Sequence, residues 1–192
     1  HFRRGVADNG TFPRIPGIEA TGVVADCPGG EFEVGTQVVT LMGGMGREFD
    51  GGYAEYTCVP ASNVIAFDSD LPRATLGAIP EMLQTAYGSL TTGVDGHKGQ
   101  TLLIRGGTSS IGLALADLAR RRGMRVISTT RQESRREFLE EHADHVVIDD
   151  GAIADKVRTL TDGGVDGAVE LVGANTLRDT LRATRTHEVV CF

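Results

Sequence analysis

The sequence predicts an α/β protein in which a doubly wound parallel sheet follows a smaller region of short strands. Three observations predict it. From residue 101 onward, short apolar runs alternate with segments of helical periodicity. The first of these runs, residues 101–105, ends at a glycine-containing turn that opens a helix, as in nucleotide-binding α/β folds. Before residue 71, short β-like runs are separated by glycine turns, which is typical of small barrels and sandwiches.

Length and composition limit the classes of protein that the chain can represent. A chain of 192 residues with 40% hydrophobic content suits one domain or two small ones. The net charge of −7 argues against a nucleic-acid partner. The three cysteines are far apart and form no C-x-x-C pair, which argues against a disulfide framework or a structural zinc site. Without a bilayer-spanning stretch or a signal peptide, we expect a cytoplasmic protein with no membrane partner.

The two ends predict that the sequence is a piece of a longer protein. It begins at His1 rather than at methionine and stops inside an apolar run, residues 189–192. We therefore expect truncation at both ends.

The first part of the chain is expected to form four short strands. Glycine-rich turns separate them, and the glycine-rich segment 42–52 is not followed by a helical pattern. That segment is thus a poor candidate for a phosphate loop and is better interpreted as a mobile or cleft-lining loop. The expected strands are 22–25, 37–41, 53–59 and 64–67.

The second part is expected to begin with two helices, 71–79 and 81–90, and then to alternate. Strictly alternating strands and helices imply a parallel sheet with right-handed crossovers. The expected strands are 101–105, 125–129, 145–148, 166–171 and 188–192, and the expected helices are 110–122, 133–142, 152–160 and 175–184.

The turn after residue 105 is the strongest candidate for a binding site. Its sequence Gly107-Thr108-Ser109-Ser110-Ile111-Gly112 follows the dinucleotide pattern G-x-G-x-x-G, with Ser109 in place of the middle glycine. Unpaired backbone N–H groups and the helix dipole at such a turn stabilise a diphosphate. Ser109 must either leave room for the phosphate or add its hydroxyl as a donor. The turn alone is also compatible with an ordinary strand-to-helix connection.

The end of the second parallel strand predicts which dinucleotide binds. An acid about twenty residues beyond the glycine turn would select NAD. Here Thr129, Thr130 and Arg131 come first, no acid occurs before Glu133, and Arg135 follows. Guanidinium groups bind a 2′-phosphate well, so these residues predict a preference for NADPH. The alternative is that the arginines only form a solvated start of a helix.

The sequence lacks the residues that zinc catalysis, serine hydrolases and short-chain reductases require. A catalytic zinc needs convergent Cys, His or Glu ligands, and the one close pair of histidines, His142 and His145, is better explained as a surface pair. The G-x-S-x-G signature of serine hydrolases is broken at Ile111. Short-chain reductases need Tyr-x-x-x-Lys after the turn, whereas all three tyrosines precede it.

Five segments, in this order and spacing, resemble the medium-chain dehydrogenase/reductase superfamily in its zinc-independent, quinone-oxidoreductase-like branch. They are PGIEATG at 16–22, DGGYAEY at 50–56, PEMLQTAY at 80–87, LIRGGTSSIG at 103–112 and ELVG at 170–173. The resemblance implies a partial GroES-like β-barrel catalytic domain, assigned to residues 1–75, and an incomplete Rossmann-like dinucleotide-binding domain, assigned to 76–192. It also implies an active site in the cleft between the domains.

The resemblance further implies hydride transfer from NAD(P)H to a quinone, an enone or another carbonyl as the small-molecule substrate. Where the zinc-dependent branch has Pro-Gly-His-Glu, this chain has Ile18, which cannot bind metal. Transferred by position, Thr85 is expected near the nicotinamide, and Val172 and Gly173 are expected along the cofactor. No catalytic proton donor is identified.

Relatives in this family also carry further barrel strands before residue 1 and a further segment after residue 192, which often builds a dimer. A homodimer is therefore possible for the intact protein. The alternative function is an NADPH-binding or structural protein of the same fold that does not turn over substrate.

Overall fold

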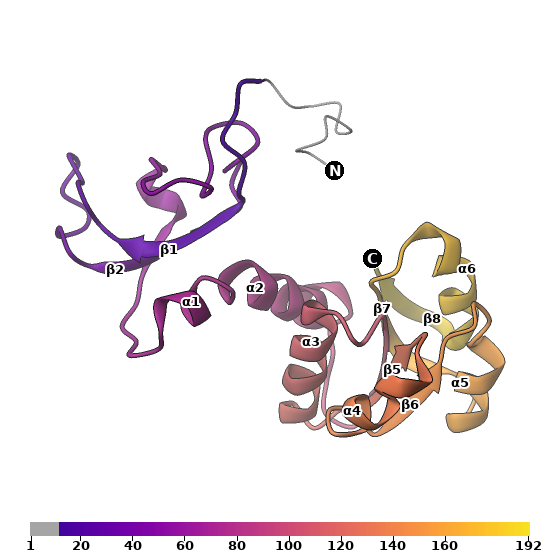
Figure 1. Cartoon of the computed structure of the whole chain (residues 1–192). Coiled ribbons are helices and arrows are strands. Elements are labelled where there is room, and N and C mark those ends of the chain that lie inside the picture. The colour runs from indigo at the N-terminus through magenta and orange to yellow at the C-terminus, as the bar shows by residue number, and fades with distance from the viewer. Residues whose placement is uncertain (1–11) are drawn as a thin grey trace. The chain divides into compact units, whose positions relative to one another are not determined.

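The computed structural model describes residues 12–192 and divides the chain into two compact units, one ending at Glu81 and the other beginning at Met82. Figure 1 shows the antiparallel strands of the first unit and the α/β layers of the second. Within residues 12–192, no helix has the length and apolar character needed to cross a membrane.

The first unit is built on an antiparallel sheet in the order β1-β2-β3. The strands are β1 (Glu19–Val23), β2 (Gln37–Leu41) and β3 (Val64–Ala66), so the expected strands at 37–41 and 64–67 form, and the first begins three residues earlier than expected. The strand predicted at 53–59 is wrong. Its aromatic residues favour β-structure but have no partner strand in the described sheet, and Tyr53 and Tyr56 are 75% and 78% exposed.

Glycines pack two of the segments that carry the family resemblance directly against each other. The N–H groups of Gly52 and Tyr53 donate to the carbonyls of Gly17 and Pro16 at 3.2 and 3.0 Å. A Cβ on Gly51 would lie 2.1 Å from the Gly17 carbonyl oxygen, so only glycine allows this approach. These contacts hold the end of segment 42–52 in place. Within the segment, Met45 is 1% exposed, and Met42, Gly44, Met45, Arg47 and Glu48 line a hollow with Ile18.

Two helices follow the three-stranded sheet. Helix α1 (Arg73–Leu76) is only one turn long, shorter than the expected 71–79, and α2 (Pro80–Gly88) continues into a π-helical turn, Ser89–Gly93. The side chain of Glu19 accepts a hydrogen bond from the Glu81 N–H at 2.9 Å. This carboxylate caps the first turn of α2, where the helix dipole favours a negative charge.

The second unit is the predicted parallel sheet, in the order β6-β5-β4-β7-β8. All four neighbouring pairs are parallel, which confirms the doubly wound α/β prediction. The strands are β4 (Thr101–Arg105), β5 (Arg125–Thr130), β6 (His145–Ile148), β7 (Val165–Glu170) and β8 (Thr184–Cys191). Strand β8 begins four residues before the expected 188, because the preceding helix ends at Ala183.

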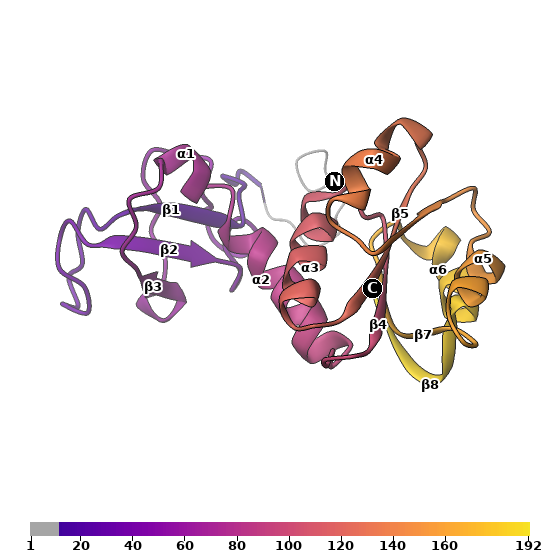
Figure 2. The same ribbon diagram turned by 90° about the horizontal axis from the view of Figure 1, so that it is seen from below.

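Helices cover both faces of this sheet (Figure 2). They are α3 (Ser110–Arg121), α4 (Arg136–Glu140), α5 (Ala154–Leu160) and α6 (Ala174–Ala183). Successive strand residues point to opposite faces, so Leu102 and Ile104 pack with α3, whereas Leu103 packs with α5 and α6. By the same alternation, Arg105 is on the face of α6, at the carboxyl end of the central strand.

Candidate dinucleotide-binding site

The turn between β4 and α3 is held by the neighbouring strand β5. The Gly107 N–H donates to the Thr129 carbonyl at 2.9 Å, and the Gly106 N–H donates to the Thr129 hydroxyl at 3.0 Å. Thr129 is 1% exposed. Its polar groups therefore fix the position of the turn, and its hydroxyl is turned toward the protein backbone.

Ser109 is the N-cap residue of α3. Its hydroxyl accepts the Gly112 N–H at 3.0 Å and donates to the Gly106 carbonyl at 2.9 Å. Of the two roles that the sequence left open for this serine, capping leaves its proton engaged within the turn. The serine thus replaces a glycine without placing a free donor at the helix start.

Three backbone N–H groups remain available at this helix start. No described residue accepts a hydrogen bond from the N–H groups of Thr108, Ser110 or Ile111. Thr108, Ser109 and Ser110 are exposed, so side chains do not close the turn. The first turn of α3 has no acidic residue, so none of its own carboxylates competes with a bound anion for the positive end of the helix dipole.

Two glycines make room for a close approach of backbone to backbone. A Cβ on Gly112 would lie 2.7 Å from the Gly106 carbonyl oxygen and 2.8 Å from the Gly107 Cα. A Cβ on Gly107 would lie 1.7 Å from the Ser128 hydroxyl, a buried group without a partner among the described residues. The turn therefore fits a diphosphate, because its donors are exposed and unpaired and its glycines hold it tight against β5.

Arginines follow β5, as the sequence predicts, but they are not equivalent. The Arg136 side chain binds Glu133 at 2.6 Å and the Val146 carbonyl at 3.1 Å. In contrast, Arg131 and Arg135 are exposed, and no ion pair or side-chain hydrogen bond joins either guanidinium to another described residue. Thr130 is buried, and its hydroxyl accepts the Gln132 N–H at 3.2 Å. The guanidinium groups of Arg131 and Arg135 are therefore available to bind a phosphate at the carboxyl end of β5.

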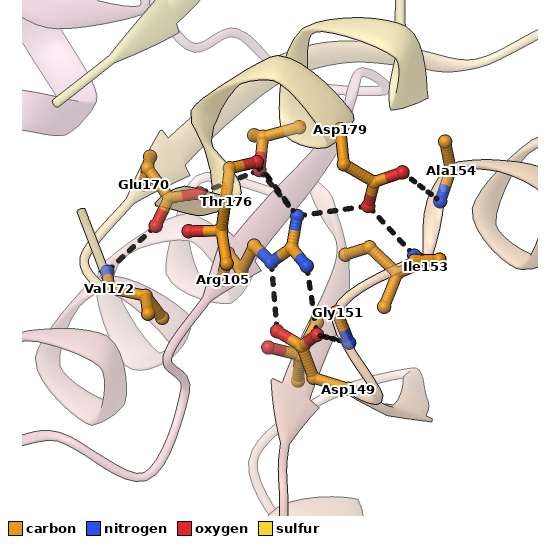
Figure 3. A network of polar contacts seen from close by, with 12 residues as sticks. Arg105, Asp149, Gly151, Ile153, Ala154, Glu170, Val172, Thr176 and Asp179 are labelled. Atoms are coloured by element: carbon orange, nitrogen blue, oxygen red, sulfur yellow. Dashed lines mark hydrogen bonds and ion pairs between the residues drawn. The ribbon is translucent and has the colours of Figure 1, made fainter. Parts of the chain in front are cut away.

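A buried ion network lies at the same edge of the sheet (Figure 3). Arg105 is 0% exposed and donates to both carboxylate oxygens of Asp149, each at 2.8 Å. Its other terminal nitrogen donates to Asp179 at 3.0 Å and to the Thr180 hydroxyl at 3.0 Å. Asp149 follows β6 and Asp179 lies on α6, so one side chain joins three elements around the end of β4.

The network continues to the segment after β7. One oxygen of Glu170 accepts the Thr180 hydroxyl at 2.6 Å, and the other accepts the N–H groups of Val172 and Gly173 at 2.7 and 3.1 Å. Sequence reasoning missed this network. The sequence did contain a signal for it, because the strands β4 and β7 each end in a charged residue. These residues, Arg105 and Glu170, are paired in register.

The other expected cofactor contacts lie outside the turn, with Thr85 on α2 and Val172 and Gly173 in the segment after β7. Thr85 lies half-buried in the middle of α2. Val172 is 50% exposed, and Gly173 has a φ of 127°, a conformation that favours glycine. His142 packs edge-on against Phe138, and His145 contacts the Arg125 guanidinium. Within residues 12–192, no group of three or more His, Cys, Asp or Glu side chains is arranged to hold a metal ion.

The ion network sets the charge of its members. Burial raises the pKa of Asp149, but the hydrogen bonds from Arg105 and the Gly151 N–H outweigh it and hold that pKa below its ordinary value. Burial also disfavours the charge of Arg105, yet the hydrogen bond and charge of Asp149 raise the pKa of the guanidinium above its usual value. Both groups are therefore ionised at neutral pH.

Acid is expected to weaken the fold through Asp149. The pKa of an aspartate in the unfolded chain is about 3.9, and the folded value is lower, so below about pH 4 the unfolded state binds more protons. The contribution is complete above about pH 4 and is lost as pH falls through the folded-state pKa. Urea midpoints measured from about pH 2 to 6 should fall less steeply in Asp149→Asn than in the wild type. Parallel curves for the two proteins would contradict this assignment.

The comparisons with known proteins agree with this geometry. The alcohol dehydrogenase GroES-like domain matches residues 1–69, and the zinc-binding dehydrogenase domain matches residues 110–192. A "Probable quinone oxidoreductase" of Schizosaccharomyces pombe is 32% identical over 90% of this chain and 52% of its own length. The chain belongs to the medium-chain dehydrogenase/reductase superfamily.

Two solved structures have the same fold as this chain. The crystal structure of AibC has a TM-score of 0.87 and 31% identity, and covers 98% of this chain and 60% of its own. A mycobacterial protein, Rv1454c, solved in complex with NADPH, has a TM-score of 0.81 and 27% identity, with coverage of 93% and 57%. This medium-chain dehydrogenase/reductase is quinone-oxidoreductase-like, and it spans about half the length of the curated quinone oxidoreductases that it matches.

Proposed function

We propose that the chain binds NADPH and forms part of an oxidoreductase that reduces a quinone, an enone or another carbonyl without zinc. The observation that carries this proposal is the exposed turn with three unpaired N–H groups at the start of α3. Its membership of a quinone-oxidoreductase-like family supports the reaction class, and the NADPH complex of Rv1454c supports the cofactor. NADPH would supply a hydride to the acceptor.

Each part of the cofactor is assigned to groups of this chain. The N–H groups of Thr108, Ser110 and Ile111 would bind the diphosphate. Arg131 and Arg135 would bind the 2′-phosphate, next to Thr130. The segment Val172–Gly173 would lie along the nicotinamide half, and Thr85 would contribute near the ring.

The absence of zinc from this proposal has its own support. Ile18 occupies the position of a zinc-ligating histidine in the resemblance, and its aliphatic side chain has no donor atom for a metal ion. We assign residues 1–75 to a partial catalytic domain and residues 76–192 to the nucleotide-binding domain. A cytoplasmic location and a homodimer stay predictions.

The preference for NADPH is tested by reversing one charge. Arg135→Glu is expected to weaken NADPH binding by roughly tenfold or more, since a guanidinium–phosphate contact becomes a like-charge contact. NADH binding should stay within about twofold, because NADH has no 2′-phosphate. Isothermal titration calorimetry measures both affinities without an optical probe, which suits a chain with no tryptophan.

Arg122→Glu is the matched control, since it makes the same charge change on an exposed arginine at the opposite end of α3. It should leave both affinities within about twofold. Equal NADPH and NADH affinities in the wild type would contradict the preference. NADPH-dependent turnover with a panel of quinones and enones then separates an oxidoreductase from a protein that only binds the cofactor.

A further inference from the structure

The segment that follows β7 lies directly against the turn that follows β4. The Leu171 N–H donates to the Arg105 carbonyl at 3.0 Å. A Cβ on Gly106 would meet Leu171 and Val172 side-chain atoms at 3.3 and 3.4 Å, so these two residues pack on the glycine that begins the turn. A ligand seated on the turn would therefore reach this segment next.

Sheet order decides which half of a dinucleotide reaches it. Strands β5 and β7 flank β4 on opposite sides. A diphosphate over the β4 turn with its 2′-phosphate ribose at the end of β5 must direct its other half toward the end of β7. That half carries the nicotinamide. Thus Val172 and Gly173 face the reactive half of the cofactor and not the adenosine half.

The backbone of Val172 and Gly173 would be poorly ordered on its own. Gly173 adopts a φ of 127°, Val172 is half exposed, and strand pairing ends before them. Glu170 restricts both residues, since one of its oxygens accepts both N–H groups. No described donor reaches the Val172 carbonyl, which leaves an acceptor held in a fixed position for an amide group.

The second carboxylate oxygen of Glu170 is held by a buried hydrogen bond. The Thr180 hydroxyl donates to its second oxygen at 2.6 Å and accepts from Arg105 at 3.0 Å. Thr180 is 0% exposed, so water does not replace this contact when the hydroxyl is lost. The chain Arg105–Thr180–Glu170 thus connects the buried ion network to the backbone beside the turn.

We propose that Glu170, oriented by Thr180 and Arg105, is a positioning residue that preorganises the Val172–Gly173 backbone for the nicotinamide half of NADPH. This inference rests on the proposed function. It follows because ordering a flexible segment at the moment of binding reduces affinity, whereas a segment that is already ordered binds without that cost. The adenosine half is bound on the other side of β4 and should not depend on Glu170.

The test compares the whole cofactor with its adenosine half. NADPH and 2′,5′-ADP are titrated by calorimetry into the wild-type chain and five variants. Thr180→Val and Glu170→Leu remove the hydrogen bond between these two side chains at similar side-chain volume. Thr180→Ser and Glu170→Gln keep an oxygen at each position. Thr159→Val makes the same change as Thr180→Val on the exposed face of α5 and serves as a control.

Thr180→Val and Glu170→Leu are expected to weaken NADPH binding by roughly tenfold and to leave 2′,5′-ADP within about twofold. Thr180→Ser, Glu170→Gln and Thr159→Val should keep both affinities. A structural role alone would change neither affinity of the folded protein or both in proportion, and either result would overturn the inference. If Glu170→Leu does not fold, Thr180→Val carries the test. A wild-type chain that binds neither ligand would refute the proposed function itself, whereas a wild type that binds both, with variants that do not differ, would refute only the positioning role.

Discussion

Replacing Gly112 with alanine is expected to destabilise the chain and to remove most of its affinity for NADPH. Alanine is the better helix former by about 1 kcal/mol, so propensity alone predicts a more stable protein. The added Cβ, however, would lie within 2.9 Å of three backbone atoms of Gly106 and Gly107, and backbone cannot move aside as a flexible side chain can. Overpacking of this kind costs about 1–3 kcal/mol, so the clash should outweigh the gain in propensity.

The effect on binding should exceed the effect on stability. Relief of the clash must move α3 away from the turn or open the turn itself, and either movement displaces the N–H groups of Thr108, Ser110 and Ile111. We expect at least a roughly tenfold weaker NADPH affinity, because anion binding here depends on the directions of these donors. Calorimetry and urea denaturation measure the two effects.

Gly88→Ala is the matched control for this substitution. Gly88 also lies in a helix, but a Cβ there meets nothing within 4 Å. This variant should be unchanged or more stable by up to about 1 kcal/mol. A Gly112→Ala protein that was as stable as Gly88→Ala and bound NADPH normally would show that the turn is not under the proposed constraint.

Replacing Arg105 with methionine is expected to be the most destabilising single change in the second unit. Methionine fills a similar volume but leaves Asp149 and Asp179 without the guanidinium that now contacts them at 2.8 and 3.0 Å. Asp149 is 8% exposed, so its charge would stay buried without a partner. Removing one member of a buried ion pair costs about 3–5 kcal/mol, a large part of the stability of a typical domain.

An exposed ion pair provides the comparison. Arg121 binds Asp117 at 2.7 Å, nearly the same distance, but both side chains are more than half exposed. Arg121→Met should therefore cost much less stability than Arg105→Met, because water already solvates both charges. Arg105→Lys keeps the charge and loses the two-pronged contact, so it should lie between the two. Urea midpoints at neutral pH give the order, and equal costs for Arg105→Met and Arg121→Met would contradict the account.

The parallel sheet could be predicted because its signals are local. Residues 101–105 and 145–148 are short apolar runs bounded by turn residues, and both form strands with the expected bounds. The start of α3 was equally visible, since two glycines and two serines precede a helical pattern. In such segments the pattern of burial and the turn chemistry favour the same structure.

Features that depend on distant partners could not be predicted in the same way. Segment 53–59 has strand-forming residues, but forming a strand requires a neighbour that sequence alone does not provide. The Arg105 network joins residues 44 to 75 positions apart in the chain. Thr129 was predicted at the cofactor from its place after the turn, but only its contacts show that its hydroxyl holds the Gly106 N–H.

The central claim is that the start of α3 binds the diphosphate of NADPH through its own backbone. Amide chemical shifts of the ¹⁵N-labelled chain, followed during titration with NADPH, test it directly. The account predicts large, saturable shifts at Thr108, Ser110 and Ile111, three amides at the start of α3 that have no partner among the described residues. Saturable binding that left these three amides unmoved and shifted others would contradict it.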